Sequence, residues 1–181
     1  MRVTDLDASI AVDLRYATAN NFTRRQIYPE AVCVLRRGTA EKLVRANAFF
    51  RRHGCRLKIW DAYRPLAVQE LFWHILPDNR FVANPVTGGS IHNRGCAVDV
   101  TLVGPGGREL AMPSAFDSFN RSACRDNPDM SAEAAANLAL LTQGMVENGF
   151  DTLDTEWWHY VDRERRRYPV ADVPLGRFAG A

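Results

Sequence analysis

The segment SIHNRGCAVDVTLV, residues 90–103, combines a turn, a strand pattern and two polar side chains that interrupt it. Side chains alternate between two faces from residue 97 to residue 103, as they do along a β-strand. Gly95, just before this run, lets the backbone turn. His92 and Asp99 therefore lie on either side of a turn into a strand. Asp99 projects from the face opposite three apolar residues, Val98, Val100 and Leu102.

The other predicted helices and strands are mixed without regular β-α-β alternation. Three helices are expected, at residues 39–53, 65–75 and 132–148. For the first, Gly38 and Thr39 offer the cap, and for the last, Ser131 does. Strands or β-favouring runs are expected at residues 31–36, 55–60, 97–103, 150–153 and 157–161. This order predicts an α+β fold, one domain of residues 1–181, with a central antiparallel sheet flanked by helices.

Composition excludes several kinds of partner. Hydrophobic residues make up 46% of the 181 residues and charged residues 24%, as in globular proteins. The formal net charge of +2 gives no broad field for a polyanion, so no nucleic-acid partner is expected. The one dense basic run, residues 163–167, is then interpreted as a solvated arginine cluster. No stretch approaches the ~20 apolar residues that cross a bilayer, so no membrane partner is expected either.

The four cysteines indicate a reducing compartment. They are spread along the chain without a C-x-x-C pair, and two lie in or beside apolar runs. We expect small buried thiols instead of a disulfide framework, and therefore a cytoplasmic location. The sequence leaves the oligomeric state open.

A second segment, EWWH at residues 156–159, adds another imidazole and another carboxylate. The chain has only four histidines, and two of them fall in these two segments. Two imidazoles and one carboxylate would give three ligands and an open fourth position, the ligand count of a catalytic zinc site. The alternative is an Asp–Arg or Asp–His pair without a metal.

The spacing of Glu156 and His159 leaves the geometry of this segment open. Three residues apart, they would share one side of a helix but point to opposite faces of a regular strand. Because the aromatic density favours a strand, a bulge or bend would be needed for both to reach one metal. The alternative is an aromatic core strand with both polar residues at its exposed edge.

Several motifs, taken together, carry a family resemblance. They are Ser-x-His-x-x-Gly-x-Ala-x-Asp at residues 90–99, EWWH at 156–159, WDAYRP at 60–65, L-x-YA-x-x-NNF at 14–22, and FD at 116–117. This set resembles the D-alanyl-D-alanine dipeptidases, part of a wider group of zinc peptidases that includes D,D-carboxypeptidases and the hedgehog signalling domain. The match spans most of residues 10–165 in the expected order. The DAYRP and YA pieces point to the dipeptidase branch.

The resemblance implies roles for individual residues. It implies one zinc ion bound by three ligands, His92, Asp99 and His159. It makes Glu156 the catalytic base and Arg64 the residue that stabilises the transition state. Three further residues are expected near the amino end of the substrate: Ser90, Tyr16 and Asp117. Residues 77–90, rich in proline, glycine and asparagine, are a candidate lid.

Each of the three pocket residues also has a local interpretation. Tyr16 could be a core aromatic residue with a satisfied hydroxyl, Asp117 a turn carboxylate, and Ser90 a loop cap. Cys96 lies between two of the implied ligands, and we expect it to be a small buried side chain and not a ligand.

The implied reaction is hydrolysis of the D-alanyl-D-alanine dipeptide to two D-alanines by metal-activated water. One alternative is a D,D-carboxypeptidase that acts on longer peptidoglycan stems. Another is a zinc-binding module without activity, against which the joint presence of Glu156 and Arg64 argues. No HExxH motif occurs, which excludes that class of metalloprotease. Whether the reaction would serve glycopeptide resistance or dipeptide recycling stays open.

Overall fold

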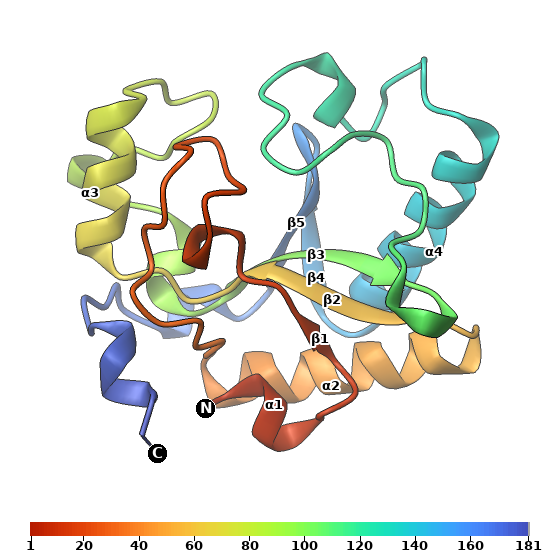
Figure 1. The fold of residues 1–181 in the computed structure, drawn as a ribbon, viewed down its shortest axis with the longest axis horizontal. Coiled ribbons are helices and arrows are strands. Elements are labelled where there is room, and N and C mark those ends of the chain that lie inside the picture. The colour runs from red at the N-terminus through yellow and green to blue at the C-terminus, as the bar shows by residue number, and fades with distance from the viewer. Residues whose placement is uncertain (181) are drawn as a thin grey trace.

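A five-stranded sheet forms the centre of the computed structural model, which describes residues 1–180 (Figure 1). The strands run in the order β1 (Ala11–Val12), β2 (Arg56–Asp61), β3 (Ala97–Val103), β5 (Glu156–Asp162) and β4 (Phe150–Leu153). Neighbouring strands are antiparallel except β1, which is parallel to β2. The α+β class and the four strands expected from residue 55 onward are therefore confirmed, and β1 makes the sheet mixed.

Four α-helices accompany the sheet: α1 (Val3–Leu6), α2 (Arg37–Arg52), α3 (Leu66–Ile75) and α4 (Ala132–Glu147). The long helices α2 and α4 pack against each other and against β2 and β4, so they cover one face of the sheet. Gly144 permits this close approach, because a Cβ there would clash with the ring of Phe50. Short 3₁₀ helices complete the chain: Arg15–Ala17, Pro85–Thr87, Ile91–Arg94, Pro105–Gly107, Arg121–Ala123, Arg165–Arg167 and Leu175–Phe178.

Two local predictions were wrong. Residues 31–36 form no strand, and their only ladder contact is an isolated bridge between Val34 and Arg2. Helix α2 begins at Arg37, so Gly38 and Thr39 are not its cap. The Thr39 hydroxyl instead donates to Asp162 at 2.6 Å, a tertiary contact that the local sequence does not reveal. The Ser131 cap of α4 is confirmed, since its side chain accepts from the Ala134 N–H.

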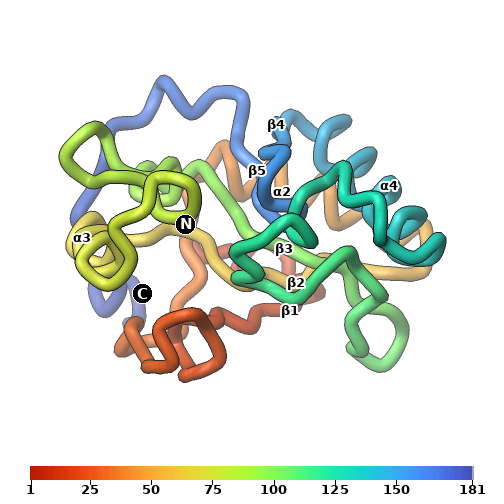
Figure 2. The backbone as a smooth tube through the Cα atoms, turned by 90° about the horizontal axis from the view of Figure 1, so that it is seen from above, coloured from red at the N-terminus to blue at the C-terminus, as the bar shows by residue number. Residues whose placement is uncertain are grey.

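Loops gather on the face of the sheet that α2 and α4 leave free. Residues 15–30, 77–90 and 105–130 surround this face, and α3 lies at one end of the molecule (Figure 2). Strand β3 lies in the middle of the sheet, and all seven of its residues are buried. A polar side chain on β3 therefore needs a partner close by. No helix among residues 1–180 is long and apolar enough to span a membrane.

Candidate metal centre and catalytic pocket

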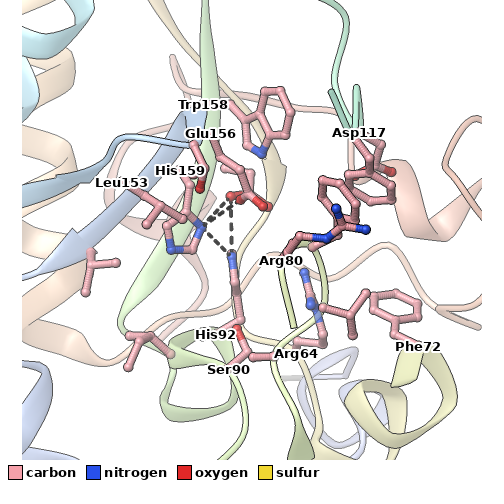
Figure 3. Close-up of a pocket in the computed structure, with 18 of the residues that line it drawn as sticks. Arg64, Phe72, Arg80, Ser90, His92, Asp117, Leu153, Glu156, Trp158 and His159 are labelled. Carbon is pink, nitrogen blue, oxygen red and sulfur yellow. Dashed lines mark hydrogen bonds and ion pairs between the residues drawn. The ribbon is translucent and has the colours of Figure 1, made fainter. Parts of the chain in front are cut away.

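Three buried side chains bring their donor atoms together at the centre of the sheet. Asp99 on β3 is directly opposite His159 on β5, and His92 approaches from the 3₁₀ helix Ile91–Arg94. His159 Nδ1 lies 2.9 Å from Asp99 Oδ1, and His92 Nε2 lies 3.2 Å from His159 Nδ1 and 3.4 Å from Asp99 Oδ1. Figure 3 shows the two imidazoles facing each other. Within residues 1–180, no other group of three His, Cys, Asp or Glu side chains places its donors this close together.

These distances fit a tetrahedral metal ion. Zinc bonds to imidazole nitrogen and carboxylate oxygen are ~2.0–2.1 Å long, which puts tetrahedral ligand atoms ~3.3 Å apart. Two neutral nitrogens and one carboxylate are also a donor set that zinc accepts. The three residues therefore fit a metal in both distance and chemistry.

The orientation of His92 is fixed by the backbone. Its Nδ1 lies 2.7 Å from the Ala62 carbonyl oxygen, which can only accept, so Nδ1 carries the proton and Nε2 keeps its lone pair. The Ser90 hydroxyl accepts from the His92 N–H and caps the short helix, and Gly95 ends it with a φ of 69°. Ser90 is thus a loop cap that also lines the cavity.

The bulge that the sequence required in the EWWH segment is present. Thr152 pairs with Tyr160, but the next residue, Leu153, pairs with Glu156, so the register shifts within β5. The shift brings Glu156 to the same side as His159, with Glu156 Oε2 4.0 Å from His159 Nδ1. The alternative, an aromatic core strand with both polar residues at its exposed edge, is therefore wrong. His159 is buried, and Glu156 lines the same cavity.

Burial and nearby charges set the ionisation of the centre. Burial raises the pKa of Asp99, but His92 and His159 lower it by more, so it lies well below its usual value. Burial lowers the pKa of His92, and the charges of Asp99 and Asp61 raise it above its usual value. Burial raises the pKa of Glu156 to about 7. Asp99 is therefore ionised and supplies the anionic oxygen that a cation site requires.

Arg64 is buried beside this centre and is held on two sides. Its Nε and Nη2 donate to Asp61 Oδ2 at 3.1 and 2.6 Å, and its Nη1 donates to Gln69 Oε1 at 2.8 Å. The guanidinium also lies over the ring of Phe72, 4.8 Å from its centroid. Burial lowers the pKa of Arg64, but the charge of Asp61 raises it well above the usual value, so the group stays charged.

Sequence reasoning did not assign the partners of this arginine. Asp61 is part of the DAYRP motif and directly follows the strand predicted at residues 55–60, which was a signal for a role. It also accepts from the Tyr28 hydroxyl at 2.7 Å. Gln69 gave no signal, because a single glutamine in a helix is unremarkable in sequence.

Tyr16 and Asp117 meet at the far side of the cavity. The Tyr16 hydroxyl donates to Asp117 Oδ1 at 3.1 Å, and the Phe22 N–H donates to Oδ2 at 3.1 Å. Asp117 has a φ of 57°, a conformation uncommon for residues other than glycine. Burial raises its pKa to about 7, and the charge of Asp99 raises it too.

One cavity of about 430 Å³ joins all these groups. The eight residues predicted for the site all line it: Tyr16, Arg64, Ser90, His92, Asp99, Asp117, Glu156 and His159. Residues of the 77–90 segment also line it, which is consistent with a lid (Figure 3). Cys96 does not line it and is fully buried, and burial raises the pKa of its thiol to about 11. Cys96 is thus a small buried side chain, as expected.

Comparison with known proteins identifies the same family as the motifs. The sequence model of the family described as D-ala-D-ala dipeptidase, Peptidase_M15, matches residues 1–173. A D-alanyl-D-alanine dipeptidase of Escherichia coli is 34% identical over 89% of this chain and 83% of its own length. One from Enterococcus faecium is 31% identical, over 90% of this chain and 91% of its own. One from Streptomyces coelicolor is 30% identical over 90% of each. This chain therefore belongs to the D-ala-D-ala dipeptidase family and is a metallopeptidase.

Proposed function

We propose that the protein hydrolyses the D-alanyl-D-alanine dipeptide to two D-alanines with one zinc ion. The observation that carries this proposal is the group of three buried donor atoms, 2.9–3.4 Å apart, in one cavity with Glu156 and Arg64. The relatives named D-alanyl-D-alanine dipeptidase support the choice of substrate.

The ligands in this proposal are His92, Asp99 and His159. Three protein ligands would leave a fourth position open on the metal, which is typical of catalytic zinc. Bound there, zinc would supply Lewis acidity for peptide hydrolysis. The Ala62 carbonyl keeps the proton of His92 on Nδ1, so that Nε2 can act as a ligand at neutral pH.

Glu156 is the general base in this proposal. Its carboxylate lies beside the three donors, 4.0 Å from His159 Nδ1, without being one of them. It takes a proton from the attacking water and delivers it to the departing amine. General acid–base catalysis of this kind works best when the pKa is near the working pH, and burial raises that of Glu156 to about 7.

Arg64 stabilises the oxyanion that forms from the peptide carbonyl. Asp61 and Gln69 fix the guanidinium before the substrate arrives, so little reorganisation is needed during the reaction. A preorganised donor aimed at a developing oxyanion is commonly worth about 3 kcal/mol. A lysine could not replace these two fixed contacts with the same geometry.

The other end of the cavity recognises the amino group of the dipeptide. Asp117 supplies a carboxylate for the ammonium, and Tyr16 and Ser90 line the pocket near it. The cavity of about 430 Å³ suits a small-molecule ligand. We further propose that residues 1–181 act as one domain and that the reaction takes place in the cytoplasm, which the four free cysteines support.

A substrate panel with zinc analysis tests this function. The purified, zinc-loaded protein should hydrolyse D-Ala-D-Ala, should leave L-Ala-L-Ala nearly untouched, and should prefer the free dipeptide to a pentapeptide stem. A preference for the pentapeptide would assign a D,D-carboxypeptidase. Binding of zinc without turnover of any of these substrates would favour the alternative, a zinc-binding module without activity.

A further inference from the structure

Gln69 is a buried side chain that makes two strong hydrogen bonds with two different parts of the site. It lies in the first turns of α3 and is fully buried. Its Oε1 accepts from Arg64 Nη1 at 2.8 Å, and its Nε2 donates to the Ala83 carbonyl at 2.7 Å. The orientation of the amide is unambiguous, because a guanidinium can only donate and a carbonyl can only accept.

The contact with Ala83 anchors the lid, which we define as residues 77–90. Within residues 1–180, no other hydrogen bond joins residues 79–89 to any residue outside the lid. Six of these eleven residues line the cavity: Asn79, Arg80, Phe81, Val82, Ala83 and Gly89. Apart from the Gln69 contact, residues 79–89 are held by packing, in which Val82 is buried and Phe81 stacks on Phe119.

The contact with Arg64 fixes the guanidinium nitrogen that Asp61 does not hold. Asp61 holds Nε and Nη2, so Nη1 is the nitrogen that only Gln69 fixes. Losing Gln69 would leave Arg64 charged and paired with Asp61, but with less restraint on its plane. A small misplacement of a catalytic group can cost a large factor in rate.

We propose that Gln69 is a positioning residue that links the lid to Arg64. One end of its amide orients the guanidinium, and the other holds the lid over the cavity at Ala83. The proposal rests on the proposed function, because it requires Arg64 to act on the substrate. It predicts that the two ends can be separated by substitution, which a glutamine that merely fills the core would not allow.

Two variants separate the two ends. Gln69→Met keeps the length of the side chain and removes both hydrogen bonds. Gln69→Glu keeps an oxygen acceptor for Arg64 but replaces the donor to Ala83 with a second oxygen, which repels the carbonyl. The turnover number kcat and KM are measured with D-Ala-D-Ala. Release of the lid is measured as trypsin cleavage after Arg80, whose side chain is 78% exposed, relative to cleavage after exposed Arg52 at the end of α2.

For Gln69→Met, we expect kcat to fall about 10-fold or more and cleavage after Arg80 to rise about 5-fold. For Gln69→Glu, we expect the same rise in cleavage and a higher KM, with kcat within about 3-fold of the wild type. The proposal is overturned if kcat of Gln69→Met stays at the wild-type value, if both variants lose kcat equally, or if Gln69→Glu leaves the lid as protected as before.

Zinc content and thermal unfolding of each variant show whether it folds. If Gln69→Met does not fold, Gln69→Glu still tests the proposal. The proposal requires this variant to show faster cleavage after Arg80 together with a kcat near the wild-type value. The cleavage after Arg80 can be measured even if the protein does not hydrolyse D-Ala-D-Ala. If the wild type does not hydrolyse D-Ala-D-Ala, the proposed function fails, while an unchanged cleavage after Arg80 in Gln69→Glu would separately refute the anchoring of the lid.

Discussion

The two halves of the cavity are held in different ways. The half that would bind the metal is built mainly on the sheet, and we call it the sheet-borne half. Asp99 and His159 are cross-strand neighbours there, and the register shift in β5 brings Glu156 to the same side. The half that would bind the ends of the substrate is built from loops and short 3₁₀ helices, and we call it the loop-borne half. There Tyr16 and Asp117 come from segments more than a hundred residues apart in sequence, and one hydrogen bond, from Gln69 to Ala83, ties residues 79–89 of the lid to the rest of the described chain.

This difference teaches which part of the site tolerates change. Residues opposite each other in an antiparallel pair have fixed separations, so the donor atoms of Asp99 and His159 are placed by the same backbone ladder that builds the sheet. Loop positions depend on individual side chains, so they can be altered with little effect on the fold. Substitutions in the sheet-borne half should therefore change chemistry, and those in the loop-borne half should change binding.

The largest effect is expected from His159→Ala, which removes a ligand from the sheet-borne half. Zinc content should fall from one ion per chain towards zero, and kcat for D-Ala-D-Ala should fall at least ~1000-fold. Metal analysis by mass spectrometry and a D-alanine assay measure both. His74→Ala, at an exposed position on α3, is the matched control and should keep both. A His159→Ala protein that keeps one zinc ion per chain and full activity would remove His159 from the ligand set.

Glu156→Gln keeps the shape of the side chain and removes the proposed base. We expect kcat to fall ~100- to 10,000-fold while one zinc stays bound, because Glu156 is not a ligand. The control is Glu147→Gln, at an exposed position of α4. Loss of both zinc and activity in Glu156→Gln would instead make Glu156 a metal ligand.

Asp117→Asn tests the loop-borne half, and asparagine also tolerates the φ of 57°. KM for D-Ala-D-Ala should rise about 10-fold with kcat nearly unchanged, since a single charge pair with the substrate ammonium is lost. Exposed Asp126→Asn should have no effect. A fall in kcat without a change in KM would move Asp117 into the chemical step.

The same residue makes a prediction about pH. Burial raises the pKa of Asp117 to about 7, so protonation below pH 7 would remove the charge proposed to bind the ammonium. For the wild type, kcat/KM should therefore decrease as the pH falls from 8 to 6. Asp117→Asn should show a shallower decrease over that range, because of the two carboxyl groups with a pKa of about 7 only Glu156 is left to titrate. Identical profiles would exclude ionised Asp117 from binding.

The smallest effect is expected away from both halves. Ser131→Ala removes the hydroxyl that caps α4, which should lower the free energy of unfolding by about 1 kcal/mol. Activity per folded molecule should not change. Chemical denaturation combined with the dipeptide assay measures the two quantities, and a loss of kcat would mean that α4 contributes to the site.

The sequence predicted the sheet-borne half better than the loop-borne half for a physical reason. The alternation along β3 is a local pattern, and local patterns can be recognised without a structure. The requirement for a bulge near Glu156 also followed from strand periodicity alone. The family resemblance supplied the roles of the individual residues, and the structure brings all eight of them to one cavity.

What the sequence missed were contacts between distant segments. The hydroxyl of Thr39 bonds Asp162 instead of capping α2, and residues 31–36 remain without a strand partner. Gln69 bridges Arg64 and the lid across fourteen residues of chain. Such side-chain contacts leave no periodic signal, so no pattern in the sequence could have indicated them.

A zinc titration of the metal-free protein tests the central claim most directly. D-Ala-D-Ala hydrolysis should be absent without metal, should rise in proportion to added zinc, and should reach its plateau at one ion per chain. Full activity in the metal-free protein, or a plateau that requires two ions, would contradict a single centre built by His92, Asp99 and His159.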